Sequence, residues 1–430
     1  MKNWAGNYQY RARRLHRPRS PDEVQEIVRS ATRIRALGSR HSFSDLADTP
    51  GDLLTLADLP RVLEVDPTTR SVTVDGALRY GELCAPLHAA GFALHAMASL
   101  PHISIAGACA TATHGSGDGS RVLPAAVSAI EIVRADGEIV RLARDGDREA
   151  FEGAVVGLGA LGIVTRLTLD IEPTFQVRQD VYEHLPLDAF AAHFDEITAS
   201  VESVSFFTDW RARVFDQVWL KRRLAGTEEP AVPSRLHGAV RATHQLHPIR
   251  ALSAAACTPQ LGVPGPWHER LPHFRMDHTP SSGDELQSEY VIGREGAVEA
   301  IAALDRLSGR LAPVVQVSEI RTIAADELWL SPAYHRPSVA IHFTWKPDWE
   351  SVRAVLPDVE RALSPFEPRP HWAKLFTMAG EDVRARYHRM ASFLELAARF
   401  DPEGKFRNDF LGRLLFADAA TARGAGPARQ

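Results

Sequence analysis

The sequence has little cysteine: only Cys84, Cys109 and Cys257 occur in 430 residues. They are widely separated and odd in number, so they support neither a disulfide framework nor a zinc-binding cluster. Because disulfides are rare in reducing compartments, a chain without them is typical of such a compartment. We therefore expect an intracellular protein.

A basic excess and long apolar stretches are also missing. The formal net charge of -5 gives no reason to expect a nucleic-acid partner. No run of about 18 apolar residues occurs, as a membrane span requires, and Met1–Tyr10 lacks the apolar stretch of an export signal. We expect a soluble, cytoplasmic monomer with no membrane or nucleic-acid partner, acting on a small uncharged substrate.

The composition is that of a globular protein, with 45% hydrophobic and 24% charged residues. Ser20 and Pro21 mark the start of a helix, and Ile34–Leu37 predicts a strand. Alternating segments around Pro67-Thr68-Thr69 and around Asp136-Gly137 predict two hairpins. Hairpins that alternate with helices predict an α+β fold class.

The pattern of helical and strand-like segments changes near Pro173. From there to about residue 375, helical segments mix with amphipathic strands, which predicts a second domain. A helix is predicted at Val383–Phe400, with a stop signal at Asp401-Pro402-Glu403-Gly404. The last ten residues, Thr421–Gln430, have the composition of a disordered tail.

Two literal motif matches fail on their context. The segment Gly157–Gly162 matches the G-x-G-x-x-G fingerprint, but a strand-like segment follows it where a helix is required. His268 and His273 resemble the histidines of a zinc protease helix, yet their spacing is one residue too long and Pro272 intervenes. We expect neither a nicotinamide site nor a metal site.

Two segments rich in glycine and hydroxyl side chains suit a large ligand. Gly38-Ser39-Arg40-His41-Ser42 forms a tight turn whose backbone N–H groups and hydroxyls can hold a pyrophosphate without a cation. Ser99–Gly117 is dominated by small residues, which permit close backbone approach to a planar ligand. An ordinary strand-to-helix turn with a surface histidine is the plain alternative for the first segment.

Together with Gly159–Val164, these segments resemble the FAD domain of the vanillyl-alcohol oxidase superfamily. Further segments resemble its bacterial alditol oxidase and xylitol oxidase branch along nearly the whole chain: Asp209-Trp210-Arg211, Gly265–Phe274, Leu286–Tyr290, Glu319-Ile320-Arg321 and Asp401–Phe406. The resemblance implies a PCMH-type FAD-binding domain at residues 1–175, completed by 380–420. An α+β substrate-binding (cap) domain would then occupy residues 176–379, followed by the tail at 421–430.

The resemblance also implies covalent FAD. In that branch the turn histidine carries the flavin, which places the linkage on His41. The other residues expected around the cofactor come from the matched segments. They are Gly38, Ser39, Arg40, Ser42, Ser99, Ser104, Gly107, Thr113, His114, Gly162 and Val164.

The sequence departs from the branch at three places. Arg40 stands where glycine is more common, Ala108-Cys109 replaces a Ser-Val pair, and Ala112 stands where glycine is common between two threonines. Arg40 either pairs with a phosphate or only restricts the turn. We expect Cys109 to be a packed small residue and not a reactive thiol.

Two strand segments carry the expected substrate site. Residues two apart on a strand project from one face, so Glu319 and Arg321 are predicted to point together, as are His342 and Thr344. A half-exposed sheet explains this pattern equally well, whereas the resemblance favours a cavity wall. Polyols present only hydroxyls, so their binding requires both donors and acceptors. By resemblance, the substrate-binding residues are Ser99, Glu319, Arg321, His342, Thr344 and Lys374.

The resemblance implies an alditol:oxygen oxidoreductase that converts a terminal CH2OH of xylitol or sorbitol to the aldehyde, with hydride transfer to FAD and reduction of O2 to hydrogen peroxide. The expected catalytic residues are Arg321, His342 and Lys374. His342 has a suitable intrinsic pKa for a base, although the sequence does not decide the base. The alternatives are an aldonolactone oxidase or dehydrogenase of the same superfamily, and a silent sugar- or flavin-binding protein.

Overall fold

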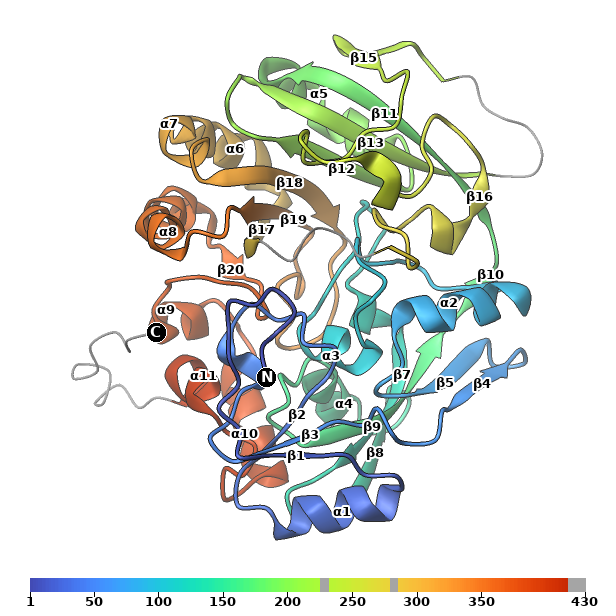
Figure 1. The fold of residues 1–430 in the computed structure, drawn as a ribbon, viewed down its shortest axis with the longest axis vertical. Helices are drawn as coiled ribbons and strands as arrows, with labels where there is room; N and C mark the ends of the chain where they lie inside the picture. Colours follow the sequence, from blue (N-terminus) through green and yellow to red (C-terminus); the bar gives the residue numbers. More distant parts are fainter. Residues whose placement is uncertain (225–231, 279–284, 417–430) are drawn as a thin grey trace.

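The structure is a computed structural model that describes residues 1–224, 232–278 and 285–416. Within these residues the chain forms four β-sheets with helices packed around them (Figure 1). The largest sheet occupies the upper half of that view, and the smaller sheets lie below it. The tail predicted at 421–430 lies outside the described residues.

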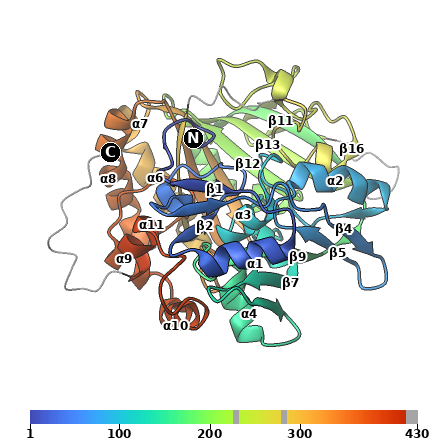
Figure 2. The same cartoon turned by 60° about the horizontal axis from the view of Figure 1, so that its bottom comes forward.

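The N-terminal sheet is parallel, with β3 between β1 and β2. Its elements are β1 (Arg14–His16), α1 (Pro21–Ser30), β2 (Ile34–Ala36) and β3 (Asp52–Leu54). The predicted start of α1 is confirmed, because the Ser20 side chain accepts a hydrogen bond from the Glu23 N–H at 3.2 Å. Figure 2 brings this helix forward; its buried Val24 and Val28 pack on Ile34 of β2.

A five-stranded antiparallel sheet lies beside it, in the order β4-β5-β9-β7-β8. Its strands are β4 (Leu63–Asp66), β5 (Ser71–Asp75), β9 (Ile163–Asp170), β7 (Val127–Val133) and β8 (Ile139–Ala143). Both predicted hairpins are confirmed, as β4–β5 and β7–β8. The segment after Gly162 is a strand, as predicted, so it does not supply the helix of a dinucleotide-binding motif.

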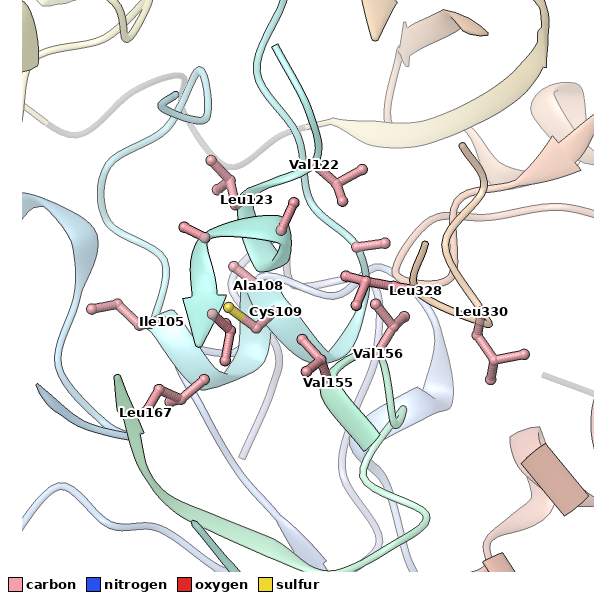
Figure 3. Close-up of a cluster of buried hydrophobic side chains, with 14 of the residues drawn as sticks. Ile105, Ala108, Cys109, Val122, Leu123, Val155, Val156, Leu167, Leu328 and Leu330 are labelled. Atoms are coloured by element: carbon pink, nitrogen blue, oxygen red, sulfur yellow. The ribbon is translucent and has the colours of Figure 1, made fainter. Parts of the chain in front are cut away.

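A cluster of buried apolar side chains packs against this sheet, where Leu167 of β9 meets Ile105, Cys109 and Val155 (Figure 3). The helices here are α2 (Tyr80–Ala89), α3 (Ile105–Ala110) and α4 (Arg148–Val155), and a short sheet pairs β6 (Phe92–Ala93) with β10 (Glu172–Pro173). Cys109 lies on α3 among Ile105, Val155 and Leu167, and burial raises the pKa of its thiol to about 12. The prediction of a packed residue is therefore confirmed.

The largest sheet runs in the order β14-β15-β11-β13-β12-β18-β19-β17-β20, with β16 paired to β11. Its strands are β14 (Arg235–Leu236), β15 (Ala239–Arg241), β11 (Gln176–Pro186), β13 (Val214–Leu224), β12 (Ser203–Thr208), β18 (Val315–Ile323), β19 (Ser338–Trp345), β17 (Leu286–Gly293), β20 (Arg369–Pro370) and β16 (Gly265–Pro266). All of its pairings are antiparallel.

Four α-helices of the described chain cover one face of this sheet. They are α5 (Leu187–Ala199), α6 (Ala297–Asp305), α7 (Ser308–Leu311) and α8 (Trp349–Leu363). Ile320, Ile341, Phe343 and Trp345 are fully buried in the core that α5, α6 and α8 share with the sheet. The predicted alternation is confirmed, and the polar residues between these positions face the other way, toward a cavity.

The C-terminal segment returns to the N-terminal strands (Figure 1). The single helix predicted at Val383–Phe400 is wrong: the structure has α9 (Gly380–Ala385) and α10 (Met390–Phe400), followed by α11 (Asp409–Leu411) and a π-helical turn at Gly412–Phe416. The break lets Tyr387 stack on Trp372, a tertiary contact that the apolar periodicity does not record.

The stop signal after Phe400 is confirmed. The Asp401 carboxylate accepts hydrogen bonds from the N–H groups of Lys405 and Phe406. The Asn408 side chain then donates to the carbonyl oxygens of Asp45, Leu46 and Asp48 near the start of the chain. Among the described residues, none of the helices has the length and apolar character that a bilayer crossing requires.

Candidate active site

A cavity of about 340 Å³ lies between the uncovered face of the large sheet and the N-terminal segments. Every residue that the sequence assigned to the cofactor or to the substrate lines it. The turn 38–42 and the segments 99–114 and 162–164 form one side. Strands β18 and β19 and the segment 371–374 form the other. Residues separated by up to about three hundred positions therefore meet in one space, and their individual roles stay predictions.

His41 lies on the turn after β2, beneath the N-terminal segment. Its ring stacks on Trp4, with centroids 5.3 Å apart and an interplanar angle of 25°. Burial, helped by the positive charges of His102, Lys374 and Arg79, lowers the pKa of His41 to about 3, so the ring is neutral at physiological pH. Within the described residues, its buried Nδ1 has no hydrogen-bond partner.

The turn that carries His41 is docked on the beginning of α3. Ser39 Oγ accepts from the Ser104 N–H at 3.0 Å, and Ser104 Oγ accepts from the Ser39 N–H at 3.4 Å. A Cβ on Gly38 would lie 2.6 Å from Ser104 Oγ, which explains the glycine. The close fit fixes the backbone on which His41 stands.

The two positions at which this chain lacks the usual glycine both have left-handed backbone. Arg40 has φ of 65° and Ala112 has φ of 56°. A residue with a Cβ is strained in that region, and glycine is not. The Arg40 guanidinium donates to the carbonyl of Lys2 at 3.3 Å. A glycine at either position would adopt this backbone without strain, whereas this chain keeps the turn geometry at a cost in strain.

Glu289 on β17 is the centre of the polar wall. Its Oε1 lies 2.9 Å from His114 Nε2, and its Oε2 lies 2.8 Å from an Arg321 nitrogen and 3.0 Å from His342 Nδ1. Burial raises the pKa of this carboxyl, but the hydrogen bonds from both histidines and the charge of Arg321 outweigh it and hold the pKa well below its usual range. Glu289 is therefore a buried carboxylate.

The carboxylate of Glu289 determines the tautomer of His342. Since a carboxylate only accepts, His342 must donate through Nδ1–H, which leaves the lone pair on Nε2. That nitrogen lies 3.3 Å from Thr344 Oγ1 on the cavity side. Burial lowers the pKa of His342 despite the hydrogen bond to Glu289, so the ring is neutral and able to accept a proton.

Glu319 and Arg321 are buried next to one another, but they are not each other's closest partner. Arg321 Nε lies 3.6 Å from Glu319 Oε1, while the guanidinium reaches Glu289 at 2.8 Å and Ser99 Oγ at 3.3 Å. Glu319 Oε1 lies 2.7 Å from His273 Nε2. The two side chains point into the same cavity, as predicted, and the contact between them is longer than those to their other partners.

Lys374 approaches the cavity from the segment after β20. Its ammonium bonds to the Gln287 side chain and lies 4.8 Å from the centre of the Phe43 ring. Burial lowers the pKa of Lys374 to about 8, although the negative charge of Glu289 opposes the shift. The site therefore holds a cation that loses its charge at a lower pH than an ordinary lysine does.

Three contributors to this wall were missed from the sequence: Glu289, Gln287 and His273. Glu285, Gln287 and Glu289 line the same cavity, and their spacing of two along a strand was a signal that could have found them. His273 was considered only as a metal ligand. Its two ring nitrogens instead face Lys221 and Glu319.

Residues His193, Glu196 and His237 form the one group in the described chain whose ligand atoms all lie within 4.8 Å. The two imidazole rings stack with centroids 3.8 Å apart and planes at 17°. Nitrogen lone pairs lie in the ring plane, so in near-parallel rings they do not converge on one ion. The group is better described as two histidines that share the exposed Glu196 carboxylate.

Comparison with known proteins identifies the class. Residues 12–143 match the family described as an FAD binding domain, and residues 283–414 match the family described as D-arabinono-1,4-lactone oxidase. The first match covers the His41 turn and the segment 99–117; the second covers Glu289, Arg321, His342 and Lys374. The chain is an FAD-dependent oxidoreductase, as its motifs predicted.

Individual relatives define the family more closely. The chain is 51% identical over 418 residues to the alditol oxidase of Streptomyces sp., covering 96% of this chain and 99% of that protein. It is 29% identical over 434 residues to the L-gulono-1,4-lactone dehydrogenase of Mycobacterium tuberculosis, covering 96% and 98%. Identity to the L-gulonolactone oxidase of Mus musculus is 22% over 439 residues, covering 97% and 98%. The protein belongs to the alditol oxidase family of the vanillyl-alcohol oxidase superfamily.

Proposed function

We propose that this protein is an alditol:oxygen oxidoreductase, which oxidises a terminal primary hydroxyl of a polyol such as xylitol or sorbitol to the aldehyde. The observation that carries the proposal is the wall of the cavity, where acceptors and donors alternate: Glu289 and Glu319 with Arg321, and Thr344 with Lys374. An uncharged molecule covered with hydroxyls can donate to the acceptors of such a wall and accept from its donors. The relation to an alditol oxidase supports the same substrate class.

The residues present fit an FAD cofactor linked covalently to His41. A covalent link needs a neutral imidazole with a free nitrogen, and His41 has a lowered pKa and an unpartnered Nδ1 within the described chain. The small residues of the turn 38–42 and of Ser104–Gly107 leave room for a large ring system along the cavity. Bound there, FAD would supply the acceptor for the hydride and the site for reaction with O2.

The side chains of the opposite wall hold the alcohol and take its proton. His342 Nε2 is the proposed base: it is neutral, faces the cavity and accepts the hydroxyl proton as the hydride leaves the same carbon. The imidazolium that forms is stabilised by Glu289 at Nδ1, as in other histidine–carboxylate pairs. Arg321 and Lys374 place positive charge where the alkoxide develops.

Two observations on purified protein test the proposal. Acid-denatured protein should give a pellet with yellow flavin fluorescence, and His41→Ala should abolish that colour because the attachment point is removed. Anaerobic addition of xylitol to the native protein should bleach the flavin, and admission of O2 should restore it with formation of hydrogen peroxide. A coloured pellet without bleaching by xylitol or sorbitol would contradict the substrate class.

A second candidate is oxidation of an aldonolactone. It is favoured by the match of residues 283–414 to a lactone oxidase family and by the two lactone-acting relatives. The same anaerobic assay separates the candidates, because bleaching by L-gulono-1,4-lactone and not by xylitol would select the lactone. We also propose that the protein acts as a cytoplasmic monomer, which cell fractionation and sedimentation would test.

A further inference from the structure

A row of three buried side chains extends from the cavity wall into the large sheet. Glu319 on β18 lies at the cavity, His273 stands beside it, and Lys221 on β13 lies behind His273, outside the cavity lining. Glu319 Oε1 is 2.7 Å from His273 Nε2, and His273 Nδ1 is 3.0 Å from Lys221 Nζ. An unbroken chain of contacts thus connects a predicted substrate-binding carboxylate with a lysine that never reaches the substrate.

The lysine at one end of the row and the carboxylate at the other together determine the direction of its hydrogen bonds. Lys221 Nζ has three partners: the carbonyl oxygens of Leu271 and Pro272, and His273 Nδ1. An ammonium has three N–H groups and no lone pair, so each partner must accept. His273 Nδ1 therefore holds the lone pair, and its proton is on Nε2, from which it donates to Glu319.

We propose that Lys221 and His273 are positioning residues for substrate binding: the lysine donates to Nδ1 and so supports the tautomer that donates through Nε2, and the histidine holds the Glu319 carboxylate toward the substrate hydroxyls. The inference rests on the proposed function, which it deepens. His273 bonds to Oε1, and the longer contact from Arg321 reaches the same atom. Among the described residues no hydrogen bond is directed to Oε2, so that oxygen accepts the substrate hydroxyl.

The surroundings of His273 allow little alternative geometry. Its ring stands edge-on between Phe207 and Trp219, at centroid distances of 5.6 and 5.1 Å. Its backbone N–H donates to the carbonyl of Ser99, a residue of the opposite cavity wall. Because the ring cannot swing away, its protonation pattern decides whether the contact with Glu319 is attractive.

The row depends on the charge of Lys221. Burial lowers the pKa of Lys221 to about 7, and the negative charge of Glu319 opposes the shift while Arg321 adds to it. Burial and the neighbouring Lys221 charge also lower the pKa of His273, to about 4, although Glu319 opposes this. The histidine is therefore neutral, and the Lys221 ammonium and the Glu319 carboxylate both favour the tautomer with the proton on Nε2.

The sign of the pH effect follows from the lowered pKa. Below about pH 7 Lys221 is an ammonium and His273 donates to Glu319. Above it the neutral amine has only two N–H groups for its three partners and carries a lone pair, which can accept from Nδ1–H. The tautomer with the proton on Nδ1 is then less disfavoured, and it turns the Nε2 lone pair toward the Glu319 carboxylate, which is repulsive. Substrate affinity should therefore fall as the pH rises through this range.

The experiment compares holoenzyme variants in anaerobic flavin reduction by xylitol across pH 6 to 9. Lys221→Met should raise KM about tenfold at pH 6.5, an amount typical of one charged hydrogen-bond network. It should also remove the pH dependence of KM near 7, while the limiting reduction rate changes less than about threefold. His273→Gln should stay close to wild type in KM, because its amide can accept from Lys221 and donate to Glu319.

Lys346→Met is the matched control. Lys346 is exposed at the end of β19 and also bonds to a backbone carbonyl, that of Pro313, but it is remote from the row. Its KM and pH profile should equal those of wild type. If Lys221→Met keeps the wild-type pH dependence of KM, or lowers the limiting rate and leaves KM unchanged, the positioning role is wrong.

A second measurement separates this inference from the proposed function. The ¹⁵N NMR signals of His273, assigned by their loss in His273→Gln, should show mainly Nε2–H at pH 6 and a smaller share of that tautomer at pH 9; Lys221→Met should show the smaller share at both. This readout requires no turnover. A wild-type protein that does not oxidise xylitol would overturn the proposed function. A His273 signal that is the same in wild type and in Lys221→Met would overturn the positioning role of the lysine.

Discussion

Glu289→Gln tests the catalytic wall at its centre. The substitution preserves the shape of the side chain and removes its charge. Glu289 accepts from His342, Arg321 and His114 at 2.8–3.0 Å. A glutamine has one acceptor oxygen, so it cannot accept from both sides. The favourable orientation places the amide oxygen toward Arg321 and His342, where Oε2 of Glu289 lies, and the amide nitrogen toward His114.

The magnitude follows from the two contacts that reach the proposed catalytic residues. A hydrogen bond to a charged group contributes about 1.5–3 kcal/mol, and a neutral one contributes about 1 kcal/mol. Loss of the charge at His342 and at Arg321 together should therefore cost about 3 kcal/mol of transition-state stabilisation. At 1.36 kcal/mol for each factor of ten, flavin reduction should slow about 100-fold.

Stopped-flow absorbance of the flavin under anaerobic conditions, with saturating xylitol, measures this rate directly. The matched control is Glu360→Gln. Glu360 accepts from the hydroxyl of Tyr290, the neighbour of Glu289 that faces the opposite side of the sheet, at 2.8 Å. The control should reduce its flavin within about twofold of wild type. A rate for Glu289→Gln within about threefold of wild type would refute the assignment of Glu289 as the partner of His342.

The remaining predictions concern pH and stability. Because Lys374 has a pKa lowered to about 8, its charge is present below that pH and lost above it, so the limiting rate of flavin reduction should fall as the pH rises through 8. Lys374→Met should lower the rate and remove this fall at alkaline pH; a variant that keeps the wild-type fall would contradict the assignment. Because the pKa of His342 is also lowered, the rate should fall on the acid side only at a pH below the usual histidine range. Arg35→Met should lower the free energy of unfolding by about 3 kcal/mol or more, because the buried guanidinium bonds to four carbonyls, of Leu46, Leu158, Gly159 and Phe406. Urea denaturation measures this, with exposed Arg33→Met as the control. Ala112→Gly should raise the free energy of unfolding by about 1 kcal/mol, since the left-handed backbone suits glycine; a loss of stability would contradict that.

Local patterns in the sequence were sufficient for the elements and for the family. The cap at Ser20, the hairpin turns and the alternation along β18 and β19 depend on neighbouring residues, and the structure confirms each of them. The resemblance, carried by the His41 turn and by the segment 99–117, led to the FAD-dependent class that the comparisons support. Where periodicity alone was used, at Val383–Phe400, one predicted helix became two, because Tyr387 stacks on a ring from another segment.

The sequence by itself determined which polar side chains of a strand point to the same face, because residues two apart on a strand project together whatever the strand packs against. Only the tertiary structure decided their partners. Arg321 binds Glu289 more closely than Glu319, and Glu319 binds His273, because β12, β17, β18 and β19 lie side by side and a loop after β16 closes over them. Such pairings join residues tens of positions apart, and burial then sets their pKa values. No local sequence pattern predicts either the partners or the pKa values.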